Sequence, residues 1–374
     1  MLFSFPLFEY KDYTLFANHS SITLLQLFNY ISPMDHKRAT IKDIALALNL
    51  SPSTVSKALR DHPNIGVITK ERVKKLAKQL HFVPNQTAIR FKQQKSFTLG
   101  ILIPSMLDHF YVAAVEGFEK FAYDHGYNVL IGQSHESIHR EKELLVTMQS
   151  NRVDGLIIAI SRETVDTTHI NEFVNSGTPI VYFMRKPINE EHHCVCSDVY
   201  TGAIDAIAYF VSRGHRRIGF INASSYWTTS RDRFLGFRDG LIQHHIPFDK
   251  SLVQESDFTQ ENNIQATRRL MQLDKPPTAI LAFKDQVMLD ALNCLRRDFP
   301  AQADFIELIG YGANPVIQYL ERPPLASLKE QPYEIGQKAG SLLLDLVNHP
   351  QAAYLPQLVK TPCELQVFSS QKQR

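Results

Sequence analysis

Short polar and cationic side chains gather on one predicted helix near the N-terminus. Ser51 and Pro52 mark its start, because serine caps helix N-termini and proline fits the first helical turn. Hydroxyls near that end and cations further along are groups that read DNA base edges and contact phosphates. The polar residues on its exposed face are Ser51, Ser53, Thr54, Ser56, Lys57 and Arg60. This spacing indicates a surface that binds nucleic acid.

A preceding helix is expected to position this one. Thr40 and Asp43 have the spacing of a capping box, and Asn49 tolerates the left-handed conformation that ends a helix. The apolar residues between them recur on one helix face: Ile41, Ile44, Ala45 and Leu48. Two short helices joined by a tight turn are typical of the helix-turn-helix, whose second helix enters the major groove.

A third helix completes the predicted bundle. Thr69 is its expected N-cap, and Val73, Leu76, Ala77 and Leu80 form its apolar face. The second helix contributes Val55, Ala58 and Leu59 to the same core. An ordinary three-helix bundle with a charged surface has the same pattern and remains an alternative at this point.

Charge is unevenly distributed along the chain. The net charge of the 374 residues is +2, but residues 37–95 contain thirteen Lys or Arg and three acidic residues. Residues 96–374 carry a net charge of −6. A small basic block joined to a larger acidic body suggests a module that binds a polyanion and is carried by a second functional unit.

The larger body alternates short apolar strands with amphipathic helices. Strands are predicted at 98–103, 128–131, 155–160, 180–183, 218–221, 279–282 and 306–311. Helices are predicted near 110–125, 137–150, 164–175 and just after 200, and from Ser230, Glu261 and Asp285. This alternation predicts an α/β fold with doubly wound parallel sheets, and the chain length suits two or three domains.

The first 33 residues are rich in Phe, Tyr and Leu but do not resemble a signal peptide. They have no basic leading segment and no small-residue cleavage site. Several polar residues within 13–34 make a membrane span a poor interpretation. We expect translation to begin at Met34, so that residues 1–36 lie outside the folded domains; a membrane or partner anchor is the alternative.

The string from Ala39 to Pro63 closely resembles the N-terminus of the LacI/GalR family of bacterial transcription regulators. The resemblance continues through 83–88, 99–104, 126–129, 152–157, 214–218 and 330–332, in the family's order. It implies an all-α helix-turn-helix domain at 37–83 and a hinge helix with its linker at 84–96. It also implies an effector-binding and dimerisation domain at 97–374, built from two α/β subdomains like periplasmic binding proteins.

The resemblance assigns DNA contacts residue by residue. The family's base-reading positions fall on Pro52, Ser53 and Lys57, and its phosphate contacts on Ser51, Thr54, Ser56 and Thr69. Lys57 and Arg60 stand where Arg and Asn are common, so guanine recognition through Lys57 is expected to be less bidentate. In the hinge the contacts fall on Asn85, Ala88 and Phe91. Phe91 takes the place of a minor-groove wedge, with packing on the core domain as its alternative role.

A second set of residues is expected in the cleft between the subdomains, beyond the carboxyl ends of the strands. Arg233 matches the family's ligand-binding arginine, and Asp285 matches a polar residue after a late strand. Met184 replaces a common Asp and Ala313 a common Asp or Asn, which argues against a plain hexose; the expected effector is a sugar or a sugar derivative. The remaining expected contacts are Asp108, Phe110, Tyr111, Gln133 and Ser134.

Other chemistry is weakly represented. Four cysteines suit a reducing cytoplasm, and the spacing of Cys194 and Cys196 is unusual for zinc, so neither a metal nor a cofactor is expected. A phosphate-binding loop is also missing from the sequence. The predicted protein is a cytoplasmic, non-enzymatic, effector-controlled regulator that binds operator DNA as a homodimer, with a tetramer as the alternative. A kinase-like enzyme with a DNA-binding appendage and a solute-binding protein are the competing classes.

Overall fold

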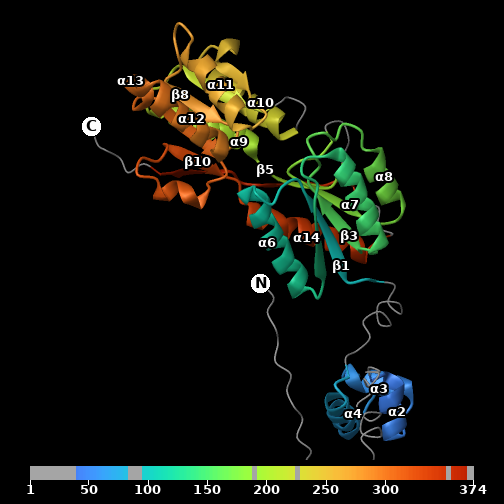
Figure 1. Ribbon diagram of the computed structural model, residues 1–374. Helices are drawn as coiled ribbons and strands as arrows, with labels where there is room; N and C mark the ends of the chain where they lie inside the picture. The colour runs from blue at the N-terminus through green and yellow to red at the C-terminus, as the bar shows by residue number, and fades with distance from the viewer. Residues whose placement is uncertain (1–38, 83–94, 188–191, 224–227, 351–354, 369–374) are drawn as a thin grey trace, which may run out of the picture. The chain divides into compact units, whose positions relative to one another are not determined.

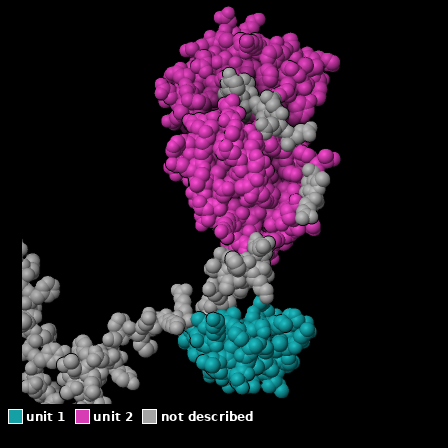
Figure 2. Space-filling model, turned by 90° about the vertical axis from the view of Figure 1, so that its right-hand side faces the viewer, with its two compact units in different colours: residues 1–89 teal, residues 90–374 magenta. Residues whose placement is uncertain are grey.

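The computed structural model describes residues 39–82, 95–187, 192–223, 228–350 and 355–368. The chain divides into two compact units, residues 1–89 and residues 90–374 (Figures 1 and 2). The N-terminal extension at 1–36 lies outside the described residues, as do hinge positions 84–94. The finer domain limits at residues 83 and 96 stay predictions.

The first unit contains three short helices: α2 (Ile41–Leu48), α3 (Pro52–Leu59) and α4 (Val67–Gln79). The predicted capping box is confirmed, because Thr40 Oγ1 accepts from the Asp43 amide while Asp43 accepts from the Thr40 amide. Asn49 ends α2 in the left-handed conformation with φ 52°. Ser51 then caps α3, as predicted. Short-range sequence signals therefore set the ends of the first two helices.

The predicted start of the third helix was wrong. Helix α4 begins at Val67, two residues before Thr69, and its N-cap is Gly66. Gly66 is extended, and its carbonyl accepts a hydrogen bond from the Lys70 amide at 3.1 Å. Because glycine has no side chain to cap the helix, the backbone alone makes this entry, and Thr69 lies inside the first turn.

The apolar faces of the three helices meet in one small core. Its fully buried members are Ile44, Val55, Ala58 and Val73, which were all predicted core positions. Leu80, also predicted to be in the core, is 40% exposed because it lies at the C-cap of α4. The rest of the bundle matches the predicted pattern.

The second unit contains two six-stranded sheets. Most strands of the first sheet come from the start of this unit. Its strand order is β11-β5-β4-β3-β1-β2, and all neighbours are parallel. The strands are β1 (Thr98–Ile103), β2 (Asn128–Gln133), β3 (Gly155–Ile158), β4 (Ile180–Phe183), β5 (Cys194–Ser197) and β11 (Leu358–Thr361). Helices α6 (His109–Asp124) and α14 (Pro332–Asn348) cover one face; α7 (Ile138–Ser150) and α8 (Thr168–Asn175) cover the other (Figure 1).

The second sheet repeats this plan with the order β12-β10-β9-β8-β6-β7. Only its pair of β10 and β12 is antiparallel. The strands are β6 (Ile218–Asn222), β7 (Val253–Glu255), β8 (Ala279–Ala282), β9 (Glu307–Tyr311), β10 (Ala326–Lys329) and β12 (Glu364–Val367). Helices α9 (Val199–Ser212) and α10 (Thr228–Gln243) cover one face; α11 (Gln260–Met271) and α12 (Asp285–Asp298) cover the other, with the short α13 (Pro300–Ala303) beyond them.

The predicted alternation of strands and helices is confirmed, and the elements that were predicted differ from the observed ones mainly at their ends. The strand predicted at 155–160 ends at Ile158, and the helix predicted at 164–175 begins at Thr168. Strands β5, β7, β10, β11 and β12 and helix α14 are missing from the predicted elements. Strands β11 and β12 lie at sheet edges and are mostly exposed, so they lack the continuous apolar run that marked the predicted strands.

The chain passes between the two sheets three times: after β5, after β10, and between β11 and β12. Buried residues join these passages. Ser197 Oγ donates to the Glu330 carbonyl and lies 3.3 Å from Thr361 Oγ1. We call Ser197, Glu330 and Thr361 the three-strand hinge. These three residues lie where the chain crosses between the two subdomains.

Candidate functional site

The exposed face of α3 carries the residues predicted to contact DNA. Ser51 Oγ accepts from the Thr54 amide at 3.1 Å and lies 2.8 Å from the hydroxyls of both Ser53 and Thr54. These hydroxyls therefore form one cluster at the N-terminus of α3. A helix N-terminus with donor groups is suited to a phosphate oxygen.

Cations follow the hydroxyl cluster along the helix. Lys57 is exposed, whereas Arg60 is held along α3 because its Nη2 donates to Ser56 Oγ at 2.6 Å. This contact orients two of the predicted DNA-binding side chains together. Pro52 is exposed at the first helical position, and Thr69 is half-buried in α4.

Asp61, an acidic residue near this surface, is paired with lysines of α4. Lys74 Nζ lies 2.6 Å from the Asp61 carboxylate, and Lys70 Nζ donates to the Asp61 carbonyl at 3.0 Å. The hydrogen bond from Lys74 lowers the pKa of Asp61. The end of α3 therefore presents little unpaired negative charge toward a polyanion. The predicted hinge contacts Asn85, Ala88 and Phe91 lie outside the described residues.

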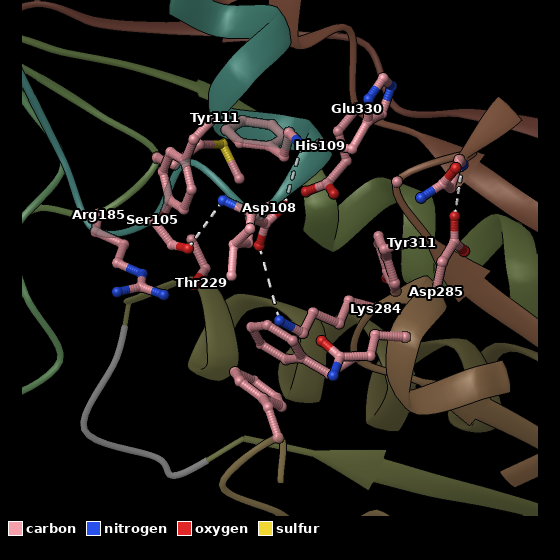
Figure 3. A pocket seen from close by; sticks show the side chains of 18 of the residues that line it. Ser105, Asp108, His109, Tyr111, Arg185, Thr229, Lys284, Asp285, Tyr311 and Glu330 are labelled. Atoms are coloured by element: carbon pink, nitrogen blue, oxygen red, sulfur yellow. Dashed lines mark hydrogen bonds and ion pairs between the residues drawn. The ribbon is translucent and has the colours of Figure 1, made fainter. Parts of the chain in front are cut away.

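A cavity of about 530 Å³ lies in the second unit and is lined from both subdomains (Figure 3). Its walls come from segments that follow strand ends: residues 105–111 after β1, Arg185 after β4, and Lys284 after β8. Parallel strands bring such segments to one edge of each sheet. The cavity is therefore in the predicted position. Five predicted contacts line it: Asp108, Phe110, Tyr111, Arg233 and Asp285.

Arg233 lies deepest among the cations of this cavity and is only 3% exposed. Its Nη2 donates to Glu330 Oε1 at 2.7 Å, and its guanidinium lies 4.3 Å from the ring centres of both Phe283 and Tyr311. Its Nε is buried without a hydrogen-bond acceptor. A buried unpaired donor is costly, so this N–H is suited to donate to a ligand oxygen.

Asp285 has both carboxylate oxygens engaged by the protein. Oδ1 accepts from Ser327 Oγ at 2.6 Å, and Oδ2 accepts from the Asn314 amide at 2.7 Å. Burial raises the pKa of Asp285 to about 7, although both hydrogen bonds oppose the rise. Asp285 thus fixes the loop after β9 as well as facing the cavity.

The segment after β1 supplies the opposite wall. Asp108 caps α6 by accepting from the Phe110 amide at 3.0 Å. Tyr111 is buried, packs edge-on against Phe110, and lies 5.9 Å from the Arg185 guanidinium carbon. Burial raises the pKa of Tyr111, so its hydroxyl stays protonated.

The cavity also contains charged residues that the sequence analysis did not assign. Arg185 Nη1 lies 2.8 Å from Glu136 Oε2. Burial tends to raise the pKa of Glu136, but the charge and hydrogen bond of Arg185 outweigh it and lower the pKa. The sequence offered one signal: Arg185 directly follows Met184, a position already placed after the fourth strand.

Lys284 reaches across the cavity from the other subdomain. Its Nζ lies 3.7 Å from Asp108 Oδ2 and 4.5 Å from the Phe258 ring centre (Figure 3). Burial lowers the pKa of Lys284, while the charge of Asp108 raises it. No pattern in the sequence indicated this ion pair.

Two predicted contacts are absent from the described lining of the cavity. Gln133 ends β2, and Ser134 follows it fully buried, with its hydroxyl lacking a hydrogen-bond partner. The loop that they begin does reach the cavity, through Glu136. Their role as direct ligand contacts stays a prediction.

Met184 and Ala313 stand where carboxylates are common in the family, but other residues of this chain bring acidic groups to the cavity. Met184 lines the cavity, and Ala313 lies between two lining residues of the loop after β9. Glu136 and Glu330 supply acidic groups instead. The absence of the usual carboxylates therefore does not leave the cavity without acceptors.

The Cys-x-Cys segment forms β5, with Cys194 buried and Cys196 half-buried. The described ranges contain no group of three or more His, Cys, Asp or Glu side chains placed to hold a metal ion. Within the same ranges, every helix is too short or too polar to cross a membrane.

Comparison with known proteins matches two family models to this chain. Residues 40–85 match the model "Bacterial regulatory proteins, lacI family", and residues 207–366 match the "Periplasmic binding protein-like domain". The first match begins with the capping box of α2 and includes all three helices of the first unit. The second includes most of the second sheet.

Full-length relatives agree with these matches. The HTH-type transcriptional repressor CytR of Escherichia coli K12 is 31% identical over 307 residues, 82% of this chain and 89% of CytR. The lac repressor dimer bound to operator and the anti-inducer ONPF superposes with TM-score 0.75 at 22% identity, covering 88% and 98% of the chains. A transcriptional regulator CelR–cellobiose complex gives TM-score 0.66 at 23% identity, covering 88% and 99%. This chain belongs to the LacI family of bacterial regulatory proteins.

Proposed function

We propose that this protein is a cytoplasmic transcriptional repressor that binds a pseudo-palindromic operator as a homodimer. In this proposal, a small, sugar-like effector in the cavity controls DNA binding. The observation that carries the proposal is that one chain combines an exposed, cationic recognition helix with a separate cavity lined from two subdomains. As a member of this family the chain is a regulator and not an enzyme, so the kinase-like alternative is set aside.

The DNA-binding half of the proposal is supported by α3. Its first turn presents Ser51, Ser53 and Thr54, and its exposed cations are Lys57 and Arg60. One such helix reads few bases, so a twofold dimer is needed to specify a promoter site. The name of CytR, a repressor, supports repression as the outcome.

The effector half is supported by Arg233. Its Nε has no partner in the structure, and it contacts Glu330, which belongs to the three-strand hinge. A ligand that binds Arg233 would therefore act on a residue where the chain crosses between the subdomains. A change in the angle between the subdomains is a means of coupling a ligand to a DNA-binding region elsewhere in the chain.

DNA binding is tested by selecting duplexes from a random pool with the full-length protein and then titrating selected and scrambled duplexes. We expect a twofold-symmetric consensus and a preference of about 10³-fold or more over scrambled DNA, weakening steeply with salt. Equal affinity for all duplexes would contradict the proposal. Analytical ultracentrifugation distinguishes the dimer from the tetramer.

Effector control is tested by thermal-shift screening with sugars, nucleosides and their derivatives, followed by titration of hits into the operator complex. A true effector changes operator affinity, and Arg233→Ala abolishes that change while operator binding without effector is kept. If Arg233→Ala instead abolishes operator binding alone, Arg233 has a structural role only.

A further inference from the structure

The charges that line the cavity are matched in a way that restricts the ligand. Besides His109, the described lining residues include four carboxylates and three Lys or Arg side chains, and each Lys or Arg has its own carboxylate. The pairs are Arg185 with Glu136 at 2.8 Å, Arg233 with Glu330 at 2.7 Å, and Lys284 with Asp108 at 3.7 Å. The fourth carboxylate, Asp285, is held by Ser327 and the Asn314 amide.

An anionic ligand would disturb this arrangement. Each of these cations already lies within 4 Å of a carboxylate, so an anionic ligand would either meet that carboxylate's like charge beside the cation or draw the cation away from it. A buried charge that loses its partner is strongly unfavourable. Glu136 illustrates the difficulty, because it is also fixed by the Arg162 amide at 2.9 Å and cannot follow a displaced Arg185. An uncharged ligand leaves all three pairs in place.

The loosest of the three pairs offers a place for a hydroxyl group. The side chains of Lys284 and Asp108 are 25% and 32% exposed, against 3% and 6% for Arg233 and Glu330. Lys284 and Asp108 come from opposite subdomains and face each other across the middle of the cavity (Figure 3). A hydroxyl between them can donate to Asp108 and accept from Lys284, so that both groups stay satisfied.

We propose that this cavity selects an uncharged, hydroxyl-bearing ligand and rejects the phosphorylated or carboxylated form of the same skeleton. Lys284 and Asp108 bind one hydroxyl from opposite sides and thereby hold the two subdomains to the ligand. Arg185 is kept from anions by Glu136. This selectivity rests on the proposed function, because it describes the effector of the same cavity.

The matched charges are tested with inorganic phosphate as the ligand. Glu136→Gln and, separately, Asp108→Asn each remove one carboxylate, and Asn can still cap α6. We expect phosphate to raise the melting temperature of each variant saturably, with an apparent Kd about tenfold or more below that of the unmodified protein. Sodium chloride at equal ionic strength is the salt control. Glu143→Gln is the variant control, since this carboxylate is 65% exposed on α7.

The outcomes of this experiment are decisive in both directions. Gain of phosphate binding by either carboxylate variant, with Glu143→Gln like the unmodified protein, supports the proposal. Tight phosphate binding by the unmodified protein that displaces a cavity ligand overturns it. Two folded variants without any gain also overturn it, because the carboxylates would then not be what excludes anions.

A second experiment compares ligands in matched pairs on the full-length protein: sorbitol with gluconate, glucose with glucose 6-phosphate, and ribose with ribose 5-phosphate. For any skeleton that binds, the neutral member should bind about tenfold or more tightly. A charged effector would overturn the charge selectivity but leave effector control intact. If neutral ligands fail while the phosphate result holds, the sugar-like effector is wrong and the charge selectivity stands.

Discussion

Arg233 and Glu330 join the ligand cavity to the hinge between the subdomains. Arg233 Nη2 lies 2.7 Å from Glu330 Oε1, and both residues are less than 5% exposed. The backbone carbonyl of Glu330 accepts from Ser197, where the chain first passes between the sheets. One residue therefore contacts the proposed ligand-binding arginine with its side chain and the hinge with its main chain.

Glu330→Gln should destabilise the second unit. Glutamine can still accept from Arg233, but the buried guanidinium loses its countercharge, so we expect the free energy of unfolding to fall by about 1–3 kcal/mol. Urea unfolding followed by circular dichroism measures this fall. The exposed replacement Glu143→Gln should change stability by no more than about 0.5 kcal/mol. Equal stability of the two variants would show that the buried pair contributes nothing specific.

Gly117→Ala should destabilise the contact between α6 and α14. A Cβ at Gly117 would lie 2.0 Å from the Tyr333 carbonyl oxygen, which is backbone and cannot move aside. We expect a loss of about 3 kcal/mol or more, or failure to fold. Gly132→Ala is the control, since its new Cβ would meet only the ends of flexible side chains, the nearest of them Leu144 at 3.1 Å. A tolerated Gly117→Ala would mean that the helices can separate without cost.

Local sequence signals predicted the fold well because they act over a few residues. The capping box of Thr40 and Asp43, the left-handed Asn49 and the Ser51 cap all depend on near neighbours, and all are present. The prediction that Thr69 caps the third helix was wrong because it, too, used only near neighbours in the sequence. The pattern could not show that the N-cap would be Gly66, three residues before Thr69, with no side-chain cap.

The cavity was predictable only in part. Its position followed from the ends of parallel strands, and the family resemblance identified Arg233 and Asp285. The pairs of Lys284 with Asp108 and of Arg185 with Glu136 join residues 176 and 49 positions apart. Such pairs depend on how two sheets face each other, and no periodicity along one segment encodes that.

Asp285 should make stability fall as pH rises. Its pKa is about 7 in the folded protein and near 3.8 when unfolded, so the folded state holds the proton more tightly. The stabilisation from this group is complete below about pH 4 and is lost as pH rises through 7. Between pH 5 and 8 the loss is of the order of 2 kcal/mol.

Comparison with Asp285→Asn isolates this contribution. The variant has no titrating group here, so its free energy of unfolding should fall less between pH 5 and 8 than that of the unmodified protein. Parallel pH curves for the two proteins would show that Asp285 is ionised throughout this range.

Lys57→Ala should weaken operator recognition at one base position. Lys57 is exposed on α3, between the hydroxyl cluster of its first turn and the Ser56–Arg60 contact. Loss of one base contact is expected to cost about 1–3 kcal/mol on the selected operator and to relax the preference there. Lys57→Arg should instead strengthen guanine preference, since a planar fork can bind two acceptors.

These outcomes are measured by titrating the selected operator and its single-base variants at one salt concentration. Lys120→Ala is the control, because Lys120 lies on α6 of the second unit and pairs with Asp124. If Lys57→Ala weakens all sequences equally, Lys57 contacts phosphate only. In that case the base-reading role passes to the first turn of α3, at Pro52 and Ser53.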